Sequence, residues 1–200
     1  MKELSLYLLD LSQNSVAAGS TRLTLSMVEG ENGALAIRLA DNGRGMSPEF
    51  LSAVGDPFTT TRTTRKVGLG IPLLRQAAEQ TGGSLAIEST LGVGTAVTVT
   101  FYVNHIDCPP MGDLPGALAA LVQGAPEVAL DFTRKTPGGS YEFSTDQMKA
   151  VLGEEISLAQ PEVYRWMKDY LAELERSAKV GTPDTEAVSK TPPTAETTRS

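Results

Sequence analysis

One acidic residue and two glycines stand close together at the end of an alternating apolar run of this 200-residue chain. Asp41 ends the run, and Gly43 and Gly45 follow it at two-residue intervals. Glycines let the backbone turn sharply or approach a ligand closely. An Asp-Asn-Gly sequence at a strand end is also a turn signal by itself. The pattern therefore predicts either a simple turn or one wall of a binding pocket.

A carboxylate and a carboxamide stand four residues apart near the N-terminus. If residues 3–18 form a helix ended by Gly19, Asp10 and Asn14 project from one face, one turn apart. The two side chains could then share one ligand. The alternative is an ordinary solvated helix face.

A third candidate stretch lies before an apolar helical pattern at residues 71–81. Gly68 and Gly70 precede that helix, so backbone N–H groups and the positive end of the helix dipole can face an anion. Lys66 stands next to them, at the end of a Thr-rich loop over residues 56–66. The stretch predicts a phosphate site, and a solvated surface loop is the alternative.

The elements that must position these residues follow each other as helix, two strands, helix, loop, helix, two strands. This order predicts an α+β fold, a two-layer sandwich of a mixed sheet with helices on one face. Ser47 followed by Pro48 marks the start of the second helix, which ends near Gly55. The other predicted ranges are 3–18 and 71–81 for helices, and 22–28, 34–40, 84–89 and 96–102 for strands.

The second half of the chain carries weaker functional signals. Residues 105–176 are predicted to form a small α-β-β-α appendage that packs on the first domain, residues 1–104, or on a partner. Within it, residues 160–174 form an amphipathic helix with apolar and aromatic side chains on one face. Residues 177–200 are rich in Thr, Pro, Ser, Glu and Lys, which predicts a disordered tail.

Composition narrows the class of protein. A net charge of −7 argues against a nucleic-acid-binding surface, which is normally basic. A single cysteine, Cys108, fits a reducing compartment. No apolar run approaches the roughly 18 residues that a membrane span needs. We therefore expect a cytoplasmic protein whose partners are neither nucleic acid nor membrane.

Taken together, five motifs in residues 1–103 resemble the ATP-binding domain of the GHKL superfamily. That superfamily includes gyrase-type topoisomerases, Hsp90 chaperones, the mismatch-repair protein MutL and sensor histidine kinases. Each motif is weak alone, but five in the correct order and spacing are specific. They are an N box at 9–19, glycine boxes Asp41-x-Gly43-x-Gly45, Gly68-Leu69-Gly70 and Gly92-x-Gly94-Thr95, and an F box at 56–61.

The resemblance implies an ATP and Mg²⁺ site in a Bergerat-type fold. Asp41 would accept a hydrogen bond from the adenine amino group with Thr95 close by, and Asn14 would hold Mg²⁺, which bridges the phosphates. The loop over residues 56–66 would close as a lid. The other residues it implies at the nucleotide are Gly43, Gly45, Met46, Phe58, Thr59, Thr60, Lys66, Gly68, Leu69 and Gly70.

Two departures from the family pattern bear on mechanism. Asp10 stands where sensor kinases usually carry Asn and the ATPase branches Glu, and a carboxylate there can act as a general base. Ala17 replaces a basic residue that kinases often carry. Only nine residues precede Asp10 of the N box, and His105 is the single histidine, so we expect no helical hairpin with a phospho-accepting histidine.

Two functions from different classes remain. The first is an enzyme that transfers the γ-phosphate to a separate protein, of histidine or serine kinase type, or that hydrolyses ATP slowly. The second is a binding module in which ATP sets the affinity for a protein partner, as in anti-sigma partner switching. Asp10 favours the first and Ala17 the second. Neither the protein partner nor the formation of a homodimer follows from the sequence.

Overall fold

The computed structural model describes residues 3–54, 70–153 and 156–180. The predicted site residues Phe58, Thr59, Thr60, Lys66, Gly68 and Leu69 lie outside these ranges, as does the predicted lid. The helices are α1 (Leu4–Ala17), α2 (Pro48–Val54), α3 (Gly70–Gln80), α4 (Leu114–Gly124), α5 (Thr145–Leu152) and α6 (Pro161–Val180). The strands are β1 (Arg22–Glu29), β2 (Ala34–Asp41), β3 (Ser84–Thr90), β4 (Gly94–Tyr102), β5 (Ala129–Thr136) and β6 (Gly139–Ser144).

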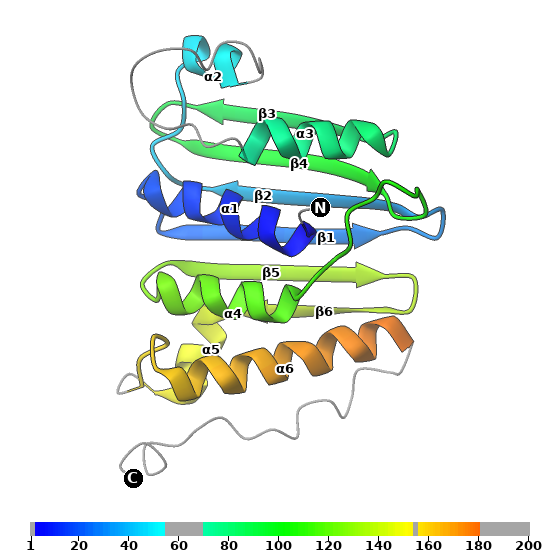
Figure 1. Ribbon diagram of the computed structural model, residues 1–200. Coiled ribbons are helices and arrows are strands. Elements are labelled where there is room, and N and C mark those ends of the chain that lie inside the picture. The colour runs from blue at the N-terminus through cyan, green and yellow to red at the C-terminus, as the bar shows by residue number, and fades with distance from the viewer. Residues whose placement is uncertain (1–2, 55–69, 154–155, 181–200) are drawn as a thin grey trace.

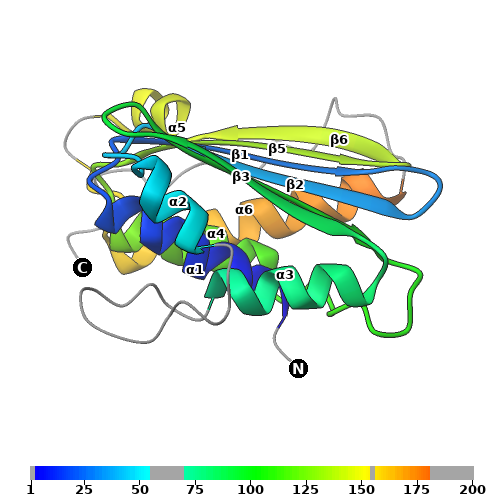
Figure 2. The same cartoon turned by 90° about the horizontal axis from the view of Figure 1, so that it is seen from above.

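The described residues form two layers. The six strands make one sheet in the order β3-β4-β2-β1-β5-β6, and α1, α3, α4 and α6 lie across one of its faces (Figures 1 and 2). Alternation along β1 explains this arrangement, because Leu23, Leu25 and Met27 are buried under the helices while Thr24 and Val28 are exposed. The predicted α+β sandwich with helices on one face is confirmed.

β1 makes the sheet mixed. It pairs antiparallel with β2 and parallel with β5, so that Leu25 is opposite Leu39 on one side and Phe132 on the other. The strands of the second half therefore extend the sheet of the first, and both halves contribute to one hydrophobic core. The boundary predicted near residue 104 falls in the connection between β4 and α4.

This connection also fixes the start of α1. Glu3, the residue before the helix, makes no side-chain capping bond. Instead the Leu4 N–H donates to Pro110 O and the Ser5 N–H donates to Met111 O, both at 2.9 Å. The first amides of a helix have no partner within it, so the second half of the chain supplies acceptors that α1 lacks.

Two element boundaries differ from the sequence prediction by more than one residue. β4 begins at Gly94, two residues before the predicted strand 96–102, because Gly94 and Thr95 pair with Thr90 and Asp41 in the ladder. α6 runs to Val180, past the predicted helix end at 174 and past 177, where the tail was predicted to begin. None of the described helices is long and apolar enough to cross a membrane.

A buried charge cluster holds the C-terminal part of α6 on the sheet. Arg134 of β5 has a side chain only 1% exposed, and its Nη2 lies 2.9 Å from Glu29 Oε2 of β1. Its Nε lies 3.5 Å from Glu175 Oε2 of α6, which also accepts a hydrogen bond of 3.0 Å from Tyr141 Oη. Lys179 Nζ lies 3.1 Å from Glu175 Oε1. Burial and the Glu175 carboxylate raise the pKa of Tyr141. The cluster joins three strands and one helix.

Candidate functional site

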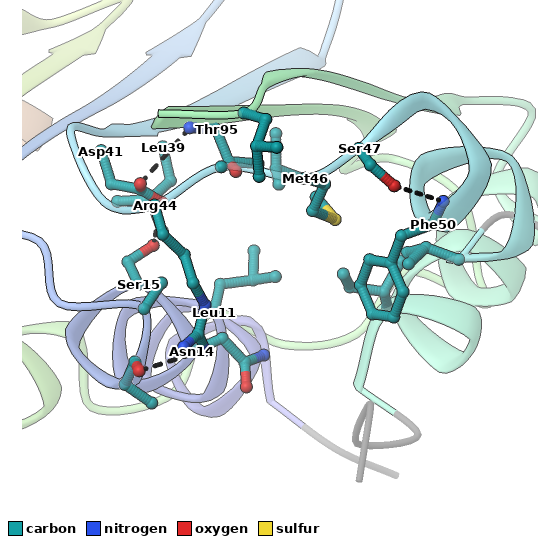
Figure 3. A pocket seen from close by; sticks show the side chains of 17 residues that line it. Leu11, Asn14, Ser15, Leu39, Asp41, Arg44, Met46, Ser47, Phe50 and Thr95 are labelled. Carbon is teal, nitrogen blue, oxygen red and sulfur yellow. Dashed lines mark hydrogen bonds between the residues drawn. The ribbon is translucent and has the colours of Figure 1, made fainter. Parts of the chain in front are cut away.

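A pocket of about 440 Å³ opens between the C-terminal half of α1, the end of β2, α2 and the β3–β4 hairpin (Figure 3). Its apolar lining comes from several elements and includes Leu11, Leu39, Met46, Phe50, Val54, Ile71 and Val97. The polar side chains that line it are Asn14, Ser15, Asp41, Arg44, Ser47 and Thr95. A mostly apolar pocket with a few convergent polar groups is typical of sites for small molecules and cofactors.

Asp41 stands at one end of the pocket with its carboxylate held in one orientation. Its Oδ2 accepts a 2.5 Å hydrogen bond from Ser15 Oγ of α1. Its Oδ1 accepts from the Gly43 N–H at 2.9 Å and from the Thr95 N–H at 3.3 Å. Because an ionised carboxylate has about four acceptor sites, Asp41 can still accept a hydrogen bond from a ligand.

The neighbouring Asn42 fixes the place where β2 ends. Its Oδ1 accepts hydrogen bonds from the Thr21 and Arg22 N–H groups at 2.9 and 3.0 Å, at the start of β1. Its Nδ2 donates to Thr21 Oγ1 at 2.8 Å. Asn42 therefore acts as a clamp behind the site, and it leaves Asp41 as the side chain that lines the pocket.

Two glycines beside Asp41 allow two backbone segments to approach each other closely. Gly45 has a φ of +65°, and a Cβ there would lie 2.0 Å from the carbonyl oxygen of Thr90 in the hairpin. A Cβ on Gly94 would lie 2.0 Å from the carbonyl oxygen of Asp41. Both positions therefore require glycine, because no side chain fits between the β2–α2 connection and the β3–β4 hairpin.

Asn14 lies at the mouth of the pocket, and its side chain is exposed. Among the described residues no group of three or more His, Cys, Asp and Glu is placed to hold a metal ion. Mg²⁺ typically takes one or two protein oxygens and completes its shell with water and substrate phosphates. The Asn14 amide oxygen, open to the pocket, fits that role for an ion that arrives with a nucleotide.

Asp10 is placed differently from Asn14. It does not line the pocket, although the two residues are one turn apart on α1. The half-buried Asp10 side chain lies beside the first residue of α3, where a Cβ on Gly70 would be 3.8 Å from Asp10 Oδ2. Asp10 therefore faces the positive end of the α3 dipole.

The residues predicted from sequence divide into three groups. Asn14, Asp41, Gly45, Met46 and Thr95 line the pocket. Gly43 is buried next to α1 and supplies its N–H to Asp41, while Asp10 and Gly70 lie together at the start of α3. The third group consists of the six residues outside the described ranges.

Sequence reasoning missed two serines and one arginine. Ser15 orients Asp41, and Arg44 lines the pocket mouth. Ser89 Oγ accepts a 2.9 Å hydrogen bond from the Met46 N–H and lies 2.8 Å from Thr95 Oγ1. A turn assigned to residues 91–93 would have identified this serine from the sequence, because the hairpin register then places Ser89 opposite Thr95.

Comparisons with known proteins identify a family and several relatives with similar sequences. Residues 2–105 match the family described as histidine kinase-, DNA gyrase B-, and HSP90-like ATPase. Over 78 residues, 37% of this chain, it is 42% identical to histidine protein kinase DivJ of Caulobacter vibrioides, of which 13% is covered. Over 106 residues, 52% of this chain, it is 31% identical to sensor histidine kinase ZraS of Escherichia coli strain K12, of which 23% is covered. The chain therefore spans less than a quarter of either relative.

A solved structure shares the fold. It is the crystal structure of the N-terminal domain of a DNA repair protein, which superposes with a TM-score of 0.51 over 79% of this chain and 55% of its own. The sequence identity of 13% limits this likeness to the fold.

Proposed function

Since the chain belongs to the histidine kinase-, DNA gyrase B- and HSP90-like ATPase family, we propose that the pocket beside Asp41 binds ATP together with Mg²⁺. One observation supports this most strongly. The Asp41 carboxylate is oriented by three donors at the end of an apolar pocket, where a flat base with an amino group can meet it.

The carboxylate gives the pocket a preference among bases. Adenine presents an exocyclic amino group, which donates a hydrogen bond to an acceptor such as Asp41. Guanine carries a carbonyl oxygen at that position and would meet the acceptor with another acceptor. A hydrogen bond to a charged group is worth about 1.5–3 kcal/mol, and an unmatched polar group costs a similar amount. Leu39, Met46 and Val97 would cover the faces of the base.

In this arrangement the phosphates extend toward Asn14 at the pocket mouth. The amide oxygen of Asn14 would hold the Mg²⁺ that accompanies the nucleotide. A bound Mg²⁺ offsets the charge of the phosphate oxygens. α3 begins at Gly70, which lies beside Asp10. The N-terminus of α3 would therefore also lie near the phosphates, where its free N–H groups suit an anion.

For the chemical step, we assign Asp10 as the general base. Its carboxylate would take the proton from the attacking group, either a side chain of a separate protein or water. The chain would then be a cytoplasmic signalling component that phosphorylates a protein partner or hydrolyses ATP slowly. The position of Asp10 supports this role, because it lies one turn before Asn14 on α1 and beside the first residue of α3, where the phosphates would extend.

The second candidate is a nucleotide-switched binding module without transfer. The observation that favours it is Ala17, whose small side chain lines the pocket where many kinases carry a cation. The protein partner would then be bound or released according to whether ATP fills the pocket. Partner capture with and without ATP would identify that protein under either candidate.

Calorimetry with Mg-ATP tests the adenine assignment. We expect Asp41→Asn to weaken ATP binding at least about tenfold, because the amide puts donors where the adenine amino group also donates. Asp107→Asn is a matched control, since Asp107 lies in an exposed loop with a side chain 63% exposed. Equal affinities for ATP in Asp41→Asn and the wild type would overturn the assignment.

Labelled ATP separates the two candidates. We expect the wild type to release or transfer the γ-phosphate and Asp10→Asn to lose at least about 100-fold in that rate, as is usual for a general base. If the wild type binds ATP but releases and transfers no phosphate, with and without partner, the binding module is the better description.

A further inference from the structure

Arg44 is the only described pocket-lining residue with a positive charge. Its backbone is fixed on both sides. The Arg44 N–H donates to Ala18 O at the end of α1 at 3.0 Å, and the Gly92 N–H of the β3–β4 turn donates to Arg44 O at 2.7 Å. The backbone position from which the Arg44 side chain extends is therefore held in place.

The guanidinium at the other end of the side chain is held much less firmly. Its single hydrogen bond within the described chain runs from Nη2 to Ala17 O at 3.4 Å, which is long for an N–H···O bond. The residue is exposed. A guanidinium has five N–H donors, so most of its donors remain available to a ligand.

The side chain extends along the mouth of the pocket. Figure 3 shows it running from the β2–α2 connection toward α1, where Asn14 is also labelled. Its contact, Ala17, lies three residues after Asn14, on the next turn of the same helix face, and both line the pocket. The guanidinium and the Asn14 amide therefore border the same opening.

The charge distribution identifies the chemistry that suits this opening. Asp41 is the single described acid in the lining, and its carboxylate is already bound by three donors at the other end of the pocket. Arg44 has no carboxylate partner within hydrogen-bond distance among the described residues. An exposed guanidinium beside an amide oxygen suits an anion with several oxygens, and planar forked donors match a phosphate.

We propose that Arg44 binds the phosphates of the nucleotide and so selects nucleotides over nucleosides. This inference rests on the proposed function and assigns a described residue that supplies positive charge to a pocket where Ala17 carries none. A competing role is purely structural, because the guanidinium near Ala17 O also faces the negative end of the α1 dipole. The two roles predict different results with ligands that lack phosphate.

Calorimetry with Mg-ATP, ADP and adenosine distinguishes them. We expect Arg44→Gln to weaken ATP and ADP binding by about 10- to 100-fold and to leave adenosine within about twofold, since a charge-assisted hydrogen bond is lost only with phosphate. Arg44→Lys should recover part of the ATP affinity. Arg38→Gln is the matched control, because Arg38 is exposed on the strand face opposite the buried Ile37 and Leu39.

Each remaining outcome decides against the phosphate contact alone or against the proposed function as well. Equal losses of affinity for adenosine and for ATP in Arg44→Gln would overturn the phosphate contact and leave the structural role. Thermal melting of the unliganded variant would then show a lower melting temperature than that of the wild type. Unchanged ATP affinity would overturn it as well. A wild-type chain that binds neither adenosine nor ATP overturns the proposed function and this inference together.

Discussion

The two halves of the chain use their polar and charged side chains in opposite ways. On the β5–β6 side the charges are paired with each other, as in the buried cluster of Arg134, Glu29 and Glu175 and in the exposed pair of Lys168 with Asp113, 2.7 Å apart. On the β2–β4 side, Asn14 and Arg44 border an open pocket.

This difference separates residues that stabilise the fold from residues that are available to a ligand. Burying an ion pair costs desolvation that the pair only partly recovers, so such a cluster mainly fixes which elements meet. Polar groups that face a pocket keep their contact with water until a ligand replaces it. The two halves should therefore respond differently to mutation, and four substitutions test that expectation.

The largest effect on stability is expected from Arg134→Met. It leaves the carboxylates of Glu29 and Glu175 without their buried cation, which typically costs about 3–5 kcal/mol. Urea unfolding should show this loss, while calorimetry at a temperature where the variant is folded should show unchanged ATP affinity. Lys168→Gln, in the exposed pair, should lose far less stability. A large fall in ATP affinity in Arg134→Met would break the separation between the halves.

The next effect should fall on the pocket. Gly45→Ala places a Cβ against the Thr90 carbonyl and requires an unfavourable φ, so the hairpin must move away from Asp41. We expect ATP affinity to fall at least about tenfold. Gly92→Ala is the matched control, because Gly92 has a φ of +79° but open space around its Cβ position. That variant should show only the backbone strain, about 1–2 kcal/mol.

A smaller effect is expected from Ser15→Ala. The substitution removes the hydroxyl that donates to Asp41 Oδ2 and leaves the carboxylate less firmly oriented. We expect ATP affinity to fall roughly five- to tenfold, in line with the loss of about 1 kcal/mol for one hydrogen bond. Ser26→Ala, on the strand face away from the helices, should bind ATP as the wild type does. Unchanged affinity in Ser15→Ala would show that Asp41 needs no support from α1.

The smallest effect concerns pH. The Lys168 ammonium and the Gly116 N–H lower the pKa of Asp113 below its ordinary value of 3.8. A lowered pKa in the folded state means that Asp113 stabilises the fold above that value and that the contribution is lost as pH falls below it. Asp113→Asn should therefore flatten the acid side of the stability profile slightly, while it keeps the ability to cap α4. Urea midpoints measured between about pH 5 and about pH 3 would show this.

Local sequence patterns were enough to predict the helices, the three pairs of consecutive strands and the fold class. The alternation of Leu23, Leu25 and Met27 and the glycines after Asp41 are signals within a few residues of each other. The parallel pairing of β1 with β5 has no such signal, because its partners are far apart in sequence and depend on how α4 crosses the sheet. The sharing of one sheet by both halves was therefore not predictable.

Within the pocket, the same limit separates the residues that were predicted from those that were missed. Asp41 and Asn14 are defining positions of recognisable motifs, whereas Ser15 and Arg44 lie inside the same motifs at positions that do not define them. Ser15 and Arg44 act through geometry that exists only after folding, since α1 must lie beside the end of β2 before Ser15 meets Asp41 or Arg44 meets Ala17. Neither residue type is unusual at its position, so composition does not mark Ser15 or Arg44 as a site residue.

The acceptors that Pro110 and Met111 offer to the first turn of α1 have a consequence for biosynthesis. α1 is made early, but these carbonyls follow only after the whole family-matched segment, residues 2–105, has been translated. On a ribosome, the nascent chain would hold Asn14 and Ser15 on a helix whose beginning is still frayed, next to a β1 edge not yet covered by β5. We therefore expect the pocket to reach its final form only when the second half emerges.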